Sequence, residues 1–128
     1  MNNLPYILAI DFDGTLCENK FPEIGAANHR LISELIRYKH NNPDTKYILW
    51  TCRDNNTPER NLDKAVEFCR EYGLEFDAVN ENLPEVKALF GNNDTRKVYA
   101  ILYLDDKSML ISQFFGSVRR VDGGVVLA

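Results

Sequence analysis

Short, continuous runs of apolar residues alternate along the chain with longer segments in which apolar residues recur at helical spacing. Three such runs lie at residues 6–10, 47–50 and 98–104, and a fourth short segment, residues 76–79, is apolar except at Asp77. A run that is apolar at every position is typical of a strand buried on both faces, whereas a strand with one face in water alternates apolar and polar residues. The pattern therefore predicts four strands.

Helical periodicity occupies the segments between these runs. Apolar side chains at four helically spaced positions predict a helix over residues 27–40, and the polar residues and proline at 41–43 would end it. A second, short helix is expected over residues 84–90, where Gly91 would close it. Each helix follows one strand and precedes the next.

Capping and turn residues mark the remaining segments. Thr57 is a favourable N-cap and Pro58 suits a first helical position, so we expect a helix to begin there and to stop at Gly73. The turn-rich segment 14–25 predicts a loop or a small hairpin, and the pattern over 118–127 predicts a strand, a turn and a strand.

Strands that alternate with helices predict an α/β fold, with a mainly parallel sheet covered by helices on both faces. The length of 128 residues suits one domain, and contents of 45% hydrophobic and 27% charged residues are typical of globular proteins. The sequence contains no repeat or linker segment. We therefore expect a single domain over residues 1–128.

Charge and cysteine usage narrow the class of protein. A net charge of −4 without a run of basic residues argues against non-specific binding of nucleic acids or membrane surfaces. No apolar stretch is long enough to cross a membrane, and the first residues do not resemble a signal peptide. Cys17, Cys52 and Cys69 are widely spaced and form no zinc-binding pattern with the two histidines, so a reduced, cytoplasmic protein is expected.

Polar and acidic residues follow each predicted strand. They are Asp11 and Asp13 after the first, Thr51, Cys52 and Arg53 after the second, Asn80, Glu81 and Asn82 after the third, and Asp105 and Asp106 after the fourth. In open α/β sheets, ligands bind at the carboxyl ends of the strands. Converging carboxylates repel one another unless a cation offsets their charge, and oxygen ligands of this kind suit Mg²⁺. We expect Cys52 to be a small buried side chain rather than a nucleophile.

Three of these segments resemble motifs of the haloacid dehalogenase (HAD) superfamily of phosphatases and phosphotransferases. DFDGTL at 11–16 resembles the first motif, YILWT at 47–51 the second and LYLDD at 102–106 the fourth. The resemblance spans most of the chain and implies a Rossmann-like domain. Within the superfamily, the chain is most similar to small hydrolases of bacteria and phages that lack a cap domain.

The resemblance implies a role for each matching residue. Asp11 would be the nucleophile that forms an aspartyl-phosphate, and Asp13 would be the general acid and base. Thr51 would donate its hydroxyl to a phosphoryl oxygen. The Mg²⁺ ion would be held by Asp11, by the main-chain carbonyl of Asp13, and by Asp105 with Asp106.

The third motif of the superfamily requires a lysine, for which the sequence offers two candidates. Lys97 precedes the fourth predicted strand, whose length of about 20 Å would place it at the opposite edge of the sheet. Lys87 lies in the helix that follows the third strand, and so begins at the active-site edge. Lys87 is the preferred candidate, and Arg53 is a further cation that could bind the substrate phosphate.

Each interval between the motifs is filled by one helix and its connections, which leaves no room for a cap domain. The expected activity is hydrolysis of phosphate monoesters, with a small-molecule or nucleotide phosphate ester as the substrate. A nucleic acid is expected to bind only as a substrate. The C-terminal strand pair could support a homo-oligomer. The alternatives are a receiver-like phospho-acceptor, disfavoured because its acceptor Asp is missing after the third strand, and a non-hydrolytic phosphate-binding protein.

Overall fold

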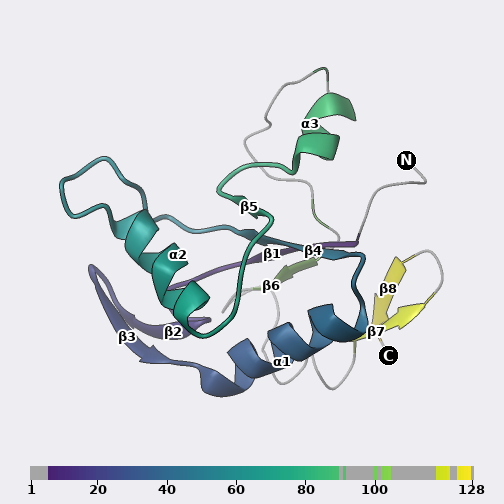
Figure 1. The fold of residues 1–128 in the computed structure, drawn as a ribbon, viewed down its shortest axis with the longest axis horizontal. Coiled ribbons are helices and arrows are strands. Elements are labelled where there is room, and N and C mark those ends of the chain that lie inside the picture. Colours follow the sequence, from purple (N-terminus) through teal and green to yellow (C-terminus); the bar gives the residue numbers. More distant parts are fainter. Residues whose placement is uncertain are drawn as a thin grey trace.

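A computed structural model describes residues 6–89, 91, 100, 102–104, 118–121 and 124–127. Four parallel strands form the central sheet in the order β5-β4-β1-β6 (Figure 1). Their bounds are Tyr6–Ile10 for β1, Thr45–Leu49 for β4, Ala78–Val79 for β5 and Leu102–Leu104 for β6. The predicted α/β class and the parallel sheet are therefore confirmed.

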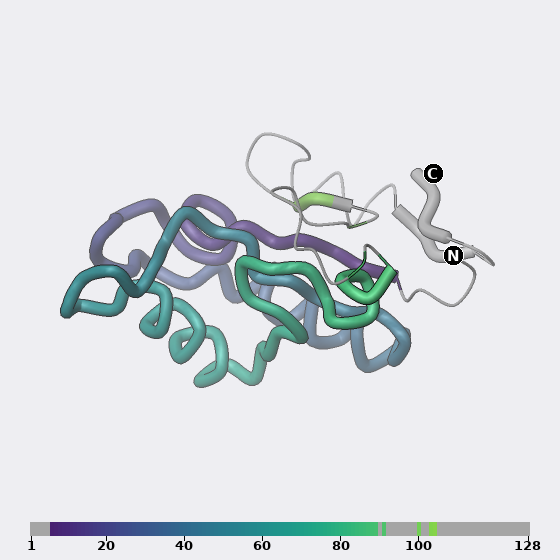
Figure 2. The backbone as a smooth tube through the Cα atoms, turned by 90° about the horizontal axis from the view of Figure 1, so that it is seen from above, coloured from purple at the N-terminus to yellow at the C-terminus, as the bar shows by residue number. Residues whose placement is uncertain are grey.

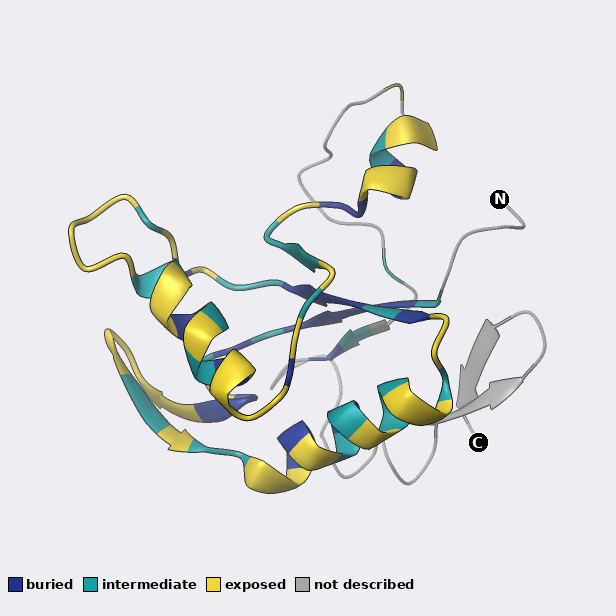
Figure 3. Cartoon of the chain, viewed as in Figure 1, coloured by how far each residue is buried: buried dark blue, intermediate teal, exposed yellow. Residues whose placement is uncertain are grey.

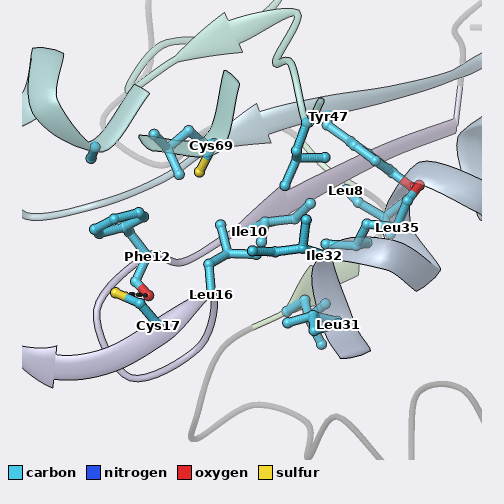
Figure 4. Packing of buried hydrophobic residues seen from close by; sticks show 14 residues of the cluster. Leu8, Ile10, Phe12, Leu16, Cys17, Leu31, Ile32, Leu35, Tyr47 and Cys69 are labelled. Atoms are coloured by element: carbon cyan, nitrogen blue, oxygen red, sulfur yellow. Dashed lines mark hydrogen bonds between the residues drawn. The ribbon is translucent and has the colours of Figure 1, made fainter. Parts of the chain in front are cut away.

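Alternate residues of β1 and β4 face two separate hydrophobic clusters, which explains why these strands are apolar at nearly every position. Leu8, Ile10, Tyr47 and Leu49 belong to the larger cluster, which includes buried residues of α1 (His29–Asn41) and α2 (Asn61–Glu71). The labelled side chains in Figure 4 belong to this cluster.

The opposite face of the sheet is covered by α3 (Pro84–Leu89). Ile7, Ala9 and Ile48 pack there with Leu83 and Val86 in the second cluster. Figures 1 and 3 show the helices on both faces of the sheet, with the strands buried and the outward faces of the helices exposed. Burial on both faces positions the carboxyl end of β1 rigidly.

Two antiparallel hairpins accompany the sheet. The first consists of β2 (Cys17–Lys20) and β3 (Glu23–Ala27), which realises the hairpin alternative for the turn-rich segment. The second consists of β7 (Val118–Val121) and β8 (Gly124–Leu127), as the sequence predicts. The first hairpin and the loop before α2 lie at the same end of β1 (Figure 2).

The predicted start of α2 was wrong. The helix begins at Asn61 rather than Pro58, because Arg60 has a left-handed φ of 50° and its amide turns back to the Thr57 carbonyl at 3.1 Å. In the first turn of the helix, the Asp63 amide donates a hydrogen bond to the side-chain oxygen of Asn55 at 3.0 Å. The capping partner comes from the preceding loop and not from Thr57.

One predicted strand is shorter in the structure, and another is described only in part. The strand predicted over 76–79 is limited to β5. The Asp77 carboxylate accepts a hydrogen bond from the Tyr47 amide at 2.8 Å, and so takes the place that a backbone carbonyl of a longer strand would occupy. The strand predicted over 98–104 is described only at its end, in β6. Among the described helices, none has the length and apolar content that crossing a membrane requires.

Candidate functional site

The loop after β1 is a tight turn that leaves Asp11 and Asp13 partly exposed at the carboxyl edge of the sheet. The Asp11 amide donates to the Leu104 carbonyl at 3.0 Å, which extends the pairing with β6 by one residue. Phe12 is fully buried, and its ring packs edge-on against Phe68. The chain then turns at Gly14, whose φ of 86° lies in the region that glycine adopts readily.

The order of the strands makes the end of β1 the switch point of the sheet. The chain proceeds from β1 to β4 and β5 on one side, and then returns to form β6 on the other side of β1. Ile10 is in register with Leu49 of β4 and with Leu104 of β6. The crevice at such a point is where open α/β sheets bind ligands, and Asp11 stands beside it.

Arg53 forms a buried ion pair with Asp13. Its Nε donates to one carboxylate oxygen of Asp13 and its Nη2 to the other, both at 2.8 Å. The Arg53 side chain is fully buried, whereas that of Asp13 retains 18% exposure. Two parallel bonds fix both the position and the plane of the carboxylate.

The remaining contacts of Arg53 lead to the tip of the β2–β3 hairpin. Its Nη1 donates to the Pro22 carbonyl at 3.1 Å and its Nη2 to the Glu23 carbonyl at 2.9 Å. The guanidinium also lies 5.0 Å from the ring centres of both Phe12 and Phe21. Sequence reasoning identified Arg53 as a cation of the site but missed these contacts, for which no sequence signal exists.

Asn80 connects the end of β5 to the loop after β4. Its Oδ1 accepts the Thr51 amide at 2.8 Å and its Nδ2 donates to the Arg53 carbonyl at 3.1 Å. The Thr51 hydroxyl accepts the Arg53 amide at 3.2 Å. Asn80 therefore holds the loop that carries Thr51 and Arg53, two of the three residues predicted to bind phosphate.

Lys87 lies on α3, and its ammonium group forms an ion pair with Glu81, the residue that follows Asn80. Its side chain is 30% exposed. The other lysine candidate, Lys97, lies outside the described residues, as do Asp105 and Asp106 of the expected metal site. The structure therefore brings together Asp11, Asp13, Thr51 and Arg53, and leaves the choice between the two lysines open.

The acidic residues that the structure describes contain no cluster of three or more potential metal-binding side chains. Asp11 and Asp13 supply carboxylate and carbonyl oxygens at the switch point, which are the donor types that Mg²⁺ prefers. Because Arg53 occupies the Asp13 carboxylate, the main-chain carbonyl of Asp13 is the better candidate ligand. The donor chemistry fits a hard divalent ion.

The three cysteines occupy different environments. The expectation that Cys52 is buried was wrong: it is exposed in the loop between Thr51 and Arg53, because the chain has left the sheet before reaching it. Burial raises the pKa of the Cys17 thiol, with the Asp13 charge as a second cause. Burial likewise raises the pKa of the Cys69 thiol to about 12.

Two hollows flank the β2–β3 hairpin. One of about 610 Å³ lies between the hairpin and α2, where Glu23 and Phe68 contribute to its walls. The other, of about 560 Å³, lies on the side of Gly14 and Asn28. The wall residues that the structure assigns to them do not include Asp11 or Asp13, so neither hollow contains the predicted catalytic carboxylates.

Comparisons with known proteins give one informative match. No family model matches the chain, and no curated protein matches it. A solved structure, described as that of a conserved protein from Bacteroides thetaiotaomicron, is similar with a TM-score of 0.67 and 34% sequence identity, over 80% of this chain and 77% of that chain. At this identity and coverage, the chain belongs to the same protein family as the conserved Bacteroides protein.

Proposed function

We propose that this protein is a Mg²⁺-dependent phosphatase of the HAD type, which hydrolyses phosphate monoesters through an aspartyl-phosphate on Asp11. The observation that carries the proposal is the position of Asp11 at the end of β1, where the strand order reverses between β4 and β6. The order of the sheet strands, which is 3-2-1-4 in chain sequence, matches the corresponding part of a Rossmann-like sheet. It supports a HAD-like domain.

The reaction follows from the residues around this point. A carboxylate oxygen of Asp11 attacks phosphorus as the bond to the leaving oxygen breaks, and Asp13 gives its proton to that oxygen, so that an alcohol departs. Water then attacks the phosphorus of the aspartyl-phosphate while Asp13 takes its proton. The bond to Asp11 breaks, which releases inorganic phosphate and restores both carboxyl groups.

The other site residues bind and orient the phosphoryl group. Thr51 lies on a loop held by Asn80, which fixes the backbone that carries its hydroxyl. Lys87 is the preferred cation for the phosphoryl group, with Lys97 as the alternative. Arg53 is better suited to positioning Asp13 than to direct phosphate contact, because its donors are already engaged.

The Mg²⁺ ion would be held by Asp11, by the Asp13 carbonyl, and by Asp105 with Asp106. When bound, it would supply charge that offsets the repulsion between the Asp11 carboxylate and the phosphate. Asp11 must be ionised to act as a nucleophile.

The substrate class follows from what lies near the site. Between β1 and α2, the chain forms only the β2–β3 hairpin, α1 and β4, which supports an enzyme without a cap domain. A small-molecule or nucleotide phosphate ester is the proposed substrate of a cytoplasmic enzyme. The acidic net charge disfavours a long nucleic acid except as the carrier of a terminal phosphate.

The test is phosphate release from sugar phosphates, nucleotides and 5′- or 3′-phosphorylated oligonucleotides. Each is assayed with Mg²⁺, with a chelator, and with the variant Asp11→Asn, which preserves size but removes the nucleophilic carboxylate. Arg37→Ala, on the exposed side of α1, serves as the control. We expect turnover only with metal and Asp11 together, and a loss of at least about 10³-fold in the variant.

Absence of phosphate release from every substrate, for a folded protein with Mg²⁺ bound, would contradict the proposal. It would favour the non-hydrolytic phosphate-binding alternative. The receiver-like alternative is disfavoured by topology, because receivers place the third strand next to the first. Here β5, the third strand of the sheet, lies at the edge beyond β4.

A further inference from the structure

We infer that Arg53 is a positioning residue that couples the Asp13 carboxylate to the tip of the β2–β3 hairpin. The inference rests on the proposed function, in which Asp13 transfers the protons. In this arrangement, the hairpin must lie in its observed position for Asp13 to be correctly oriented. The hairpin tip thus becomes part of the catalytic apparatus without contacting the phosphoryl group.

The first step of the argument concerns orientation. A carboxylate that rotates freely presents its oxygens in many directions, and proton transfer requires one of them to face the reacting oxygen at hydrogen-bond distance. The two bonds of 2.8 Å from Arg53 lock the plane of the Asp13 carboxylate. Each oxygen of the carboxylate retains a second lone pair for the substrate side.

The second step concerns how Arg53 itself is held. The Phe12 and Phe21 rings lie near its guanidinium at equal distances of 5.0 Å, and the carbonyls of Pro22 and Glu23 accept two further hydrogen bonds. Three of these four contacts come from the hairpin tip. If the hairpin lifted, Arg53 would lose them and would remain attached chiefly to Asp13.

The third step concerns the other end of the side chain. The Arg53 backbone is fixed by Asn80 through its carbonyl and by the Thr51 hydroxyl through its amide. The guanidinium therefore joins a rigid loop of the sheet to the hairpin. Since the side chain is fully buried, it cannot exchange these partners for water while the hairpin is closed.

The donor count separates positioning from direct binding. An arginine has five N–H donors, and four hydrogen bonds engage Nε, Nη1 and Nη2 of Arg53. At most one donor is left for a substrate phosphate, which is too few for bidentate recognition. A phosphate that captured the guanidinium would also have to release Asp13.

The experiment compares the wild-type enzyme with Arg53→Lys and Arg53→Ala, and with Arg37→Ala as the matched surface control. Steady-state kinetics are measured on the best substrate from the panel above. Exchange of the hairpin amides over residues 17–27 is followed by hydrogen–deuterium exchange, which requires no activity. Guanidinium chloride is added to Arg53→Ala at concentrations far below those that unfold proteins.

We expect Arg53→Ala to lower kcat by about 10²-fold, with KM changed much less, because a displaced proton-transfer group affects the transition state more than binding. Guanidinium should restore part of kcat by occupying the vacated space. Arg53→Lys should retain an intermediate kcat. Exchange of the hairpin amides should accelerate in both Arg53 variants and remain unchanged in Arg37→Ala.

Other results would overturn the inference. An increase in KM at constant kcat would identify Arg53 as a direct phosphate ligand, and unchanged hairpin exchange would remove the coupling. If Arg53→Ala does not fold, Phe21→Leu gives the same test, because Phe21 is 57% exposed and its replacement removes only the outer ring. That variant should accelerate hairpin exchange and lower kcat.

Failure of the proposed function has a different signature. A wild-type protein without phosphatase activity would refute the proposed reaction, while the exchange experiment would still report whether Arg53 holds the hairpin. A wild-type protein with activity, combined with Arg53 variants that retain wild-type kcat and exchange, would refute only the inference.

Discussion

Replacing Asn80 by alanine would disconnect the loop after β4 from the end of β5. The side chain of Asn80 makes two hydrogen bonds, which join it to the Thr51 amide at 2.8 Å and to the Arg53 carbonyl at 3.1 Å. Its backbone has a φ of 54°, a left-handed conformation that asparagine tolerates better than alanine. The substitution therefore removes two bonds and adds backbone strain.

The size of the effect can be worked from these two contributions. Each hydrogen bond contributes about 0.5–1.5 kcal/mol net, so the two together contribute about 1–3 kcal/mol. Placing alanine in the left-handed region adds about 1 kcal/mol. We expect Asn80→Ala to lower the free energy of unfolding by about 2–4 kcal/mol, a large part of the roughly 5–15 kcal/mol typical of a domain.

Asn80→Gly separates the two contributions, since glycine loses the same hydrogen bonds but accepts the positive φ. It should be destabilised less than Asn80→Ala by about 1 kcal/mol. Urea unfolding of both variants measures these differences, with Asn56→Ala, an exposed residue of the neighbouring loop, as the control. An Asn80→Ala variant within 0.5 kcal/mol of the wild type would refute the reasoning, and an Asn80→Gly variant less stable than Asn80→Ala would refute the strain contribution.

Two further predictions concern the cysteines. Because burial raises the pKa of Cys69 from its ordinary 9.0 to about 12, the folded state keeps a proton that the unfolded state loses, so the contribution of Cys69 to stability should be constant below pH 9 and fall as the pH rises from 9 towards 12. Urea unfolding at stepped pH values checks this, and a Cys69→Ala variant with an equally steep decline would contradict it. Of the three thiols, only exposed Cys52 should react rapidly with a disulfide reagent in the native protein, whereas all three should react in denaturant. Rapid reaction of two or three thiols in the native state would show that the burial of Cys17 or Cys69 is wrong.

Local sequence signals predicted the elements where nothing distant competes with them. The β1 strand was predicted over its observed residues, because a fully apolar run of this length suits only a buried strand. Gly91, which follows α3, has a φ of 67°, the left-handed conformation that glycine often adopts just after a helix. Here the local preference and the tertiary fold agree.

Elsewhere a distant partner overrode the local signal. Thr57 and Pro58 form a favourable helix start, but contacts of Asn55 with Asp63 move the start to Asn61. Similarly, the Asp77 side chain accepts a hydrogen bond from the Tyr47 amide, and β5 is shorter than predicted. Side chains of loops and strand ends decide such cases, and a single-sequence pattern does not record where they will lie.

The sequence by itself determined the α/β class, the approximate positions of β1 and β4, and the placement of Asp11, Asp13 and Thr51 just beyond strand ends, because apolar runs and turn residues act over a few neighbouring positions. Only the tertiary structure decided that β1 lies between β4 and β6, and that Arg53 pairs with Asp13 across 40 residues of sequence. The order of strands depends on how whole crossovers pack, and the ion pair depends on three segments meeting in one buried place. Neither is written in the spacing of residues along the chain.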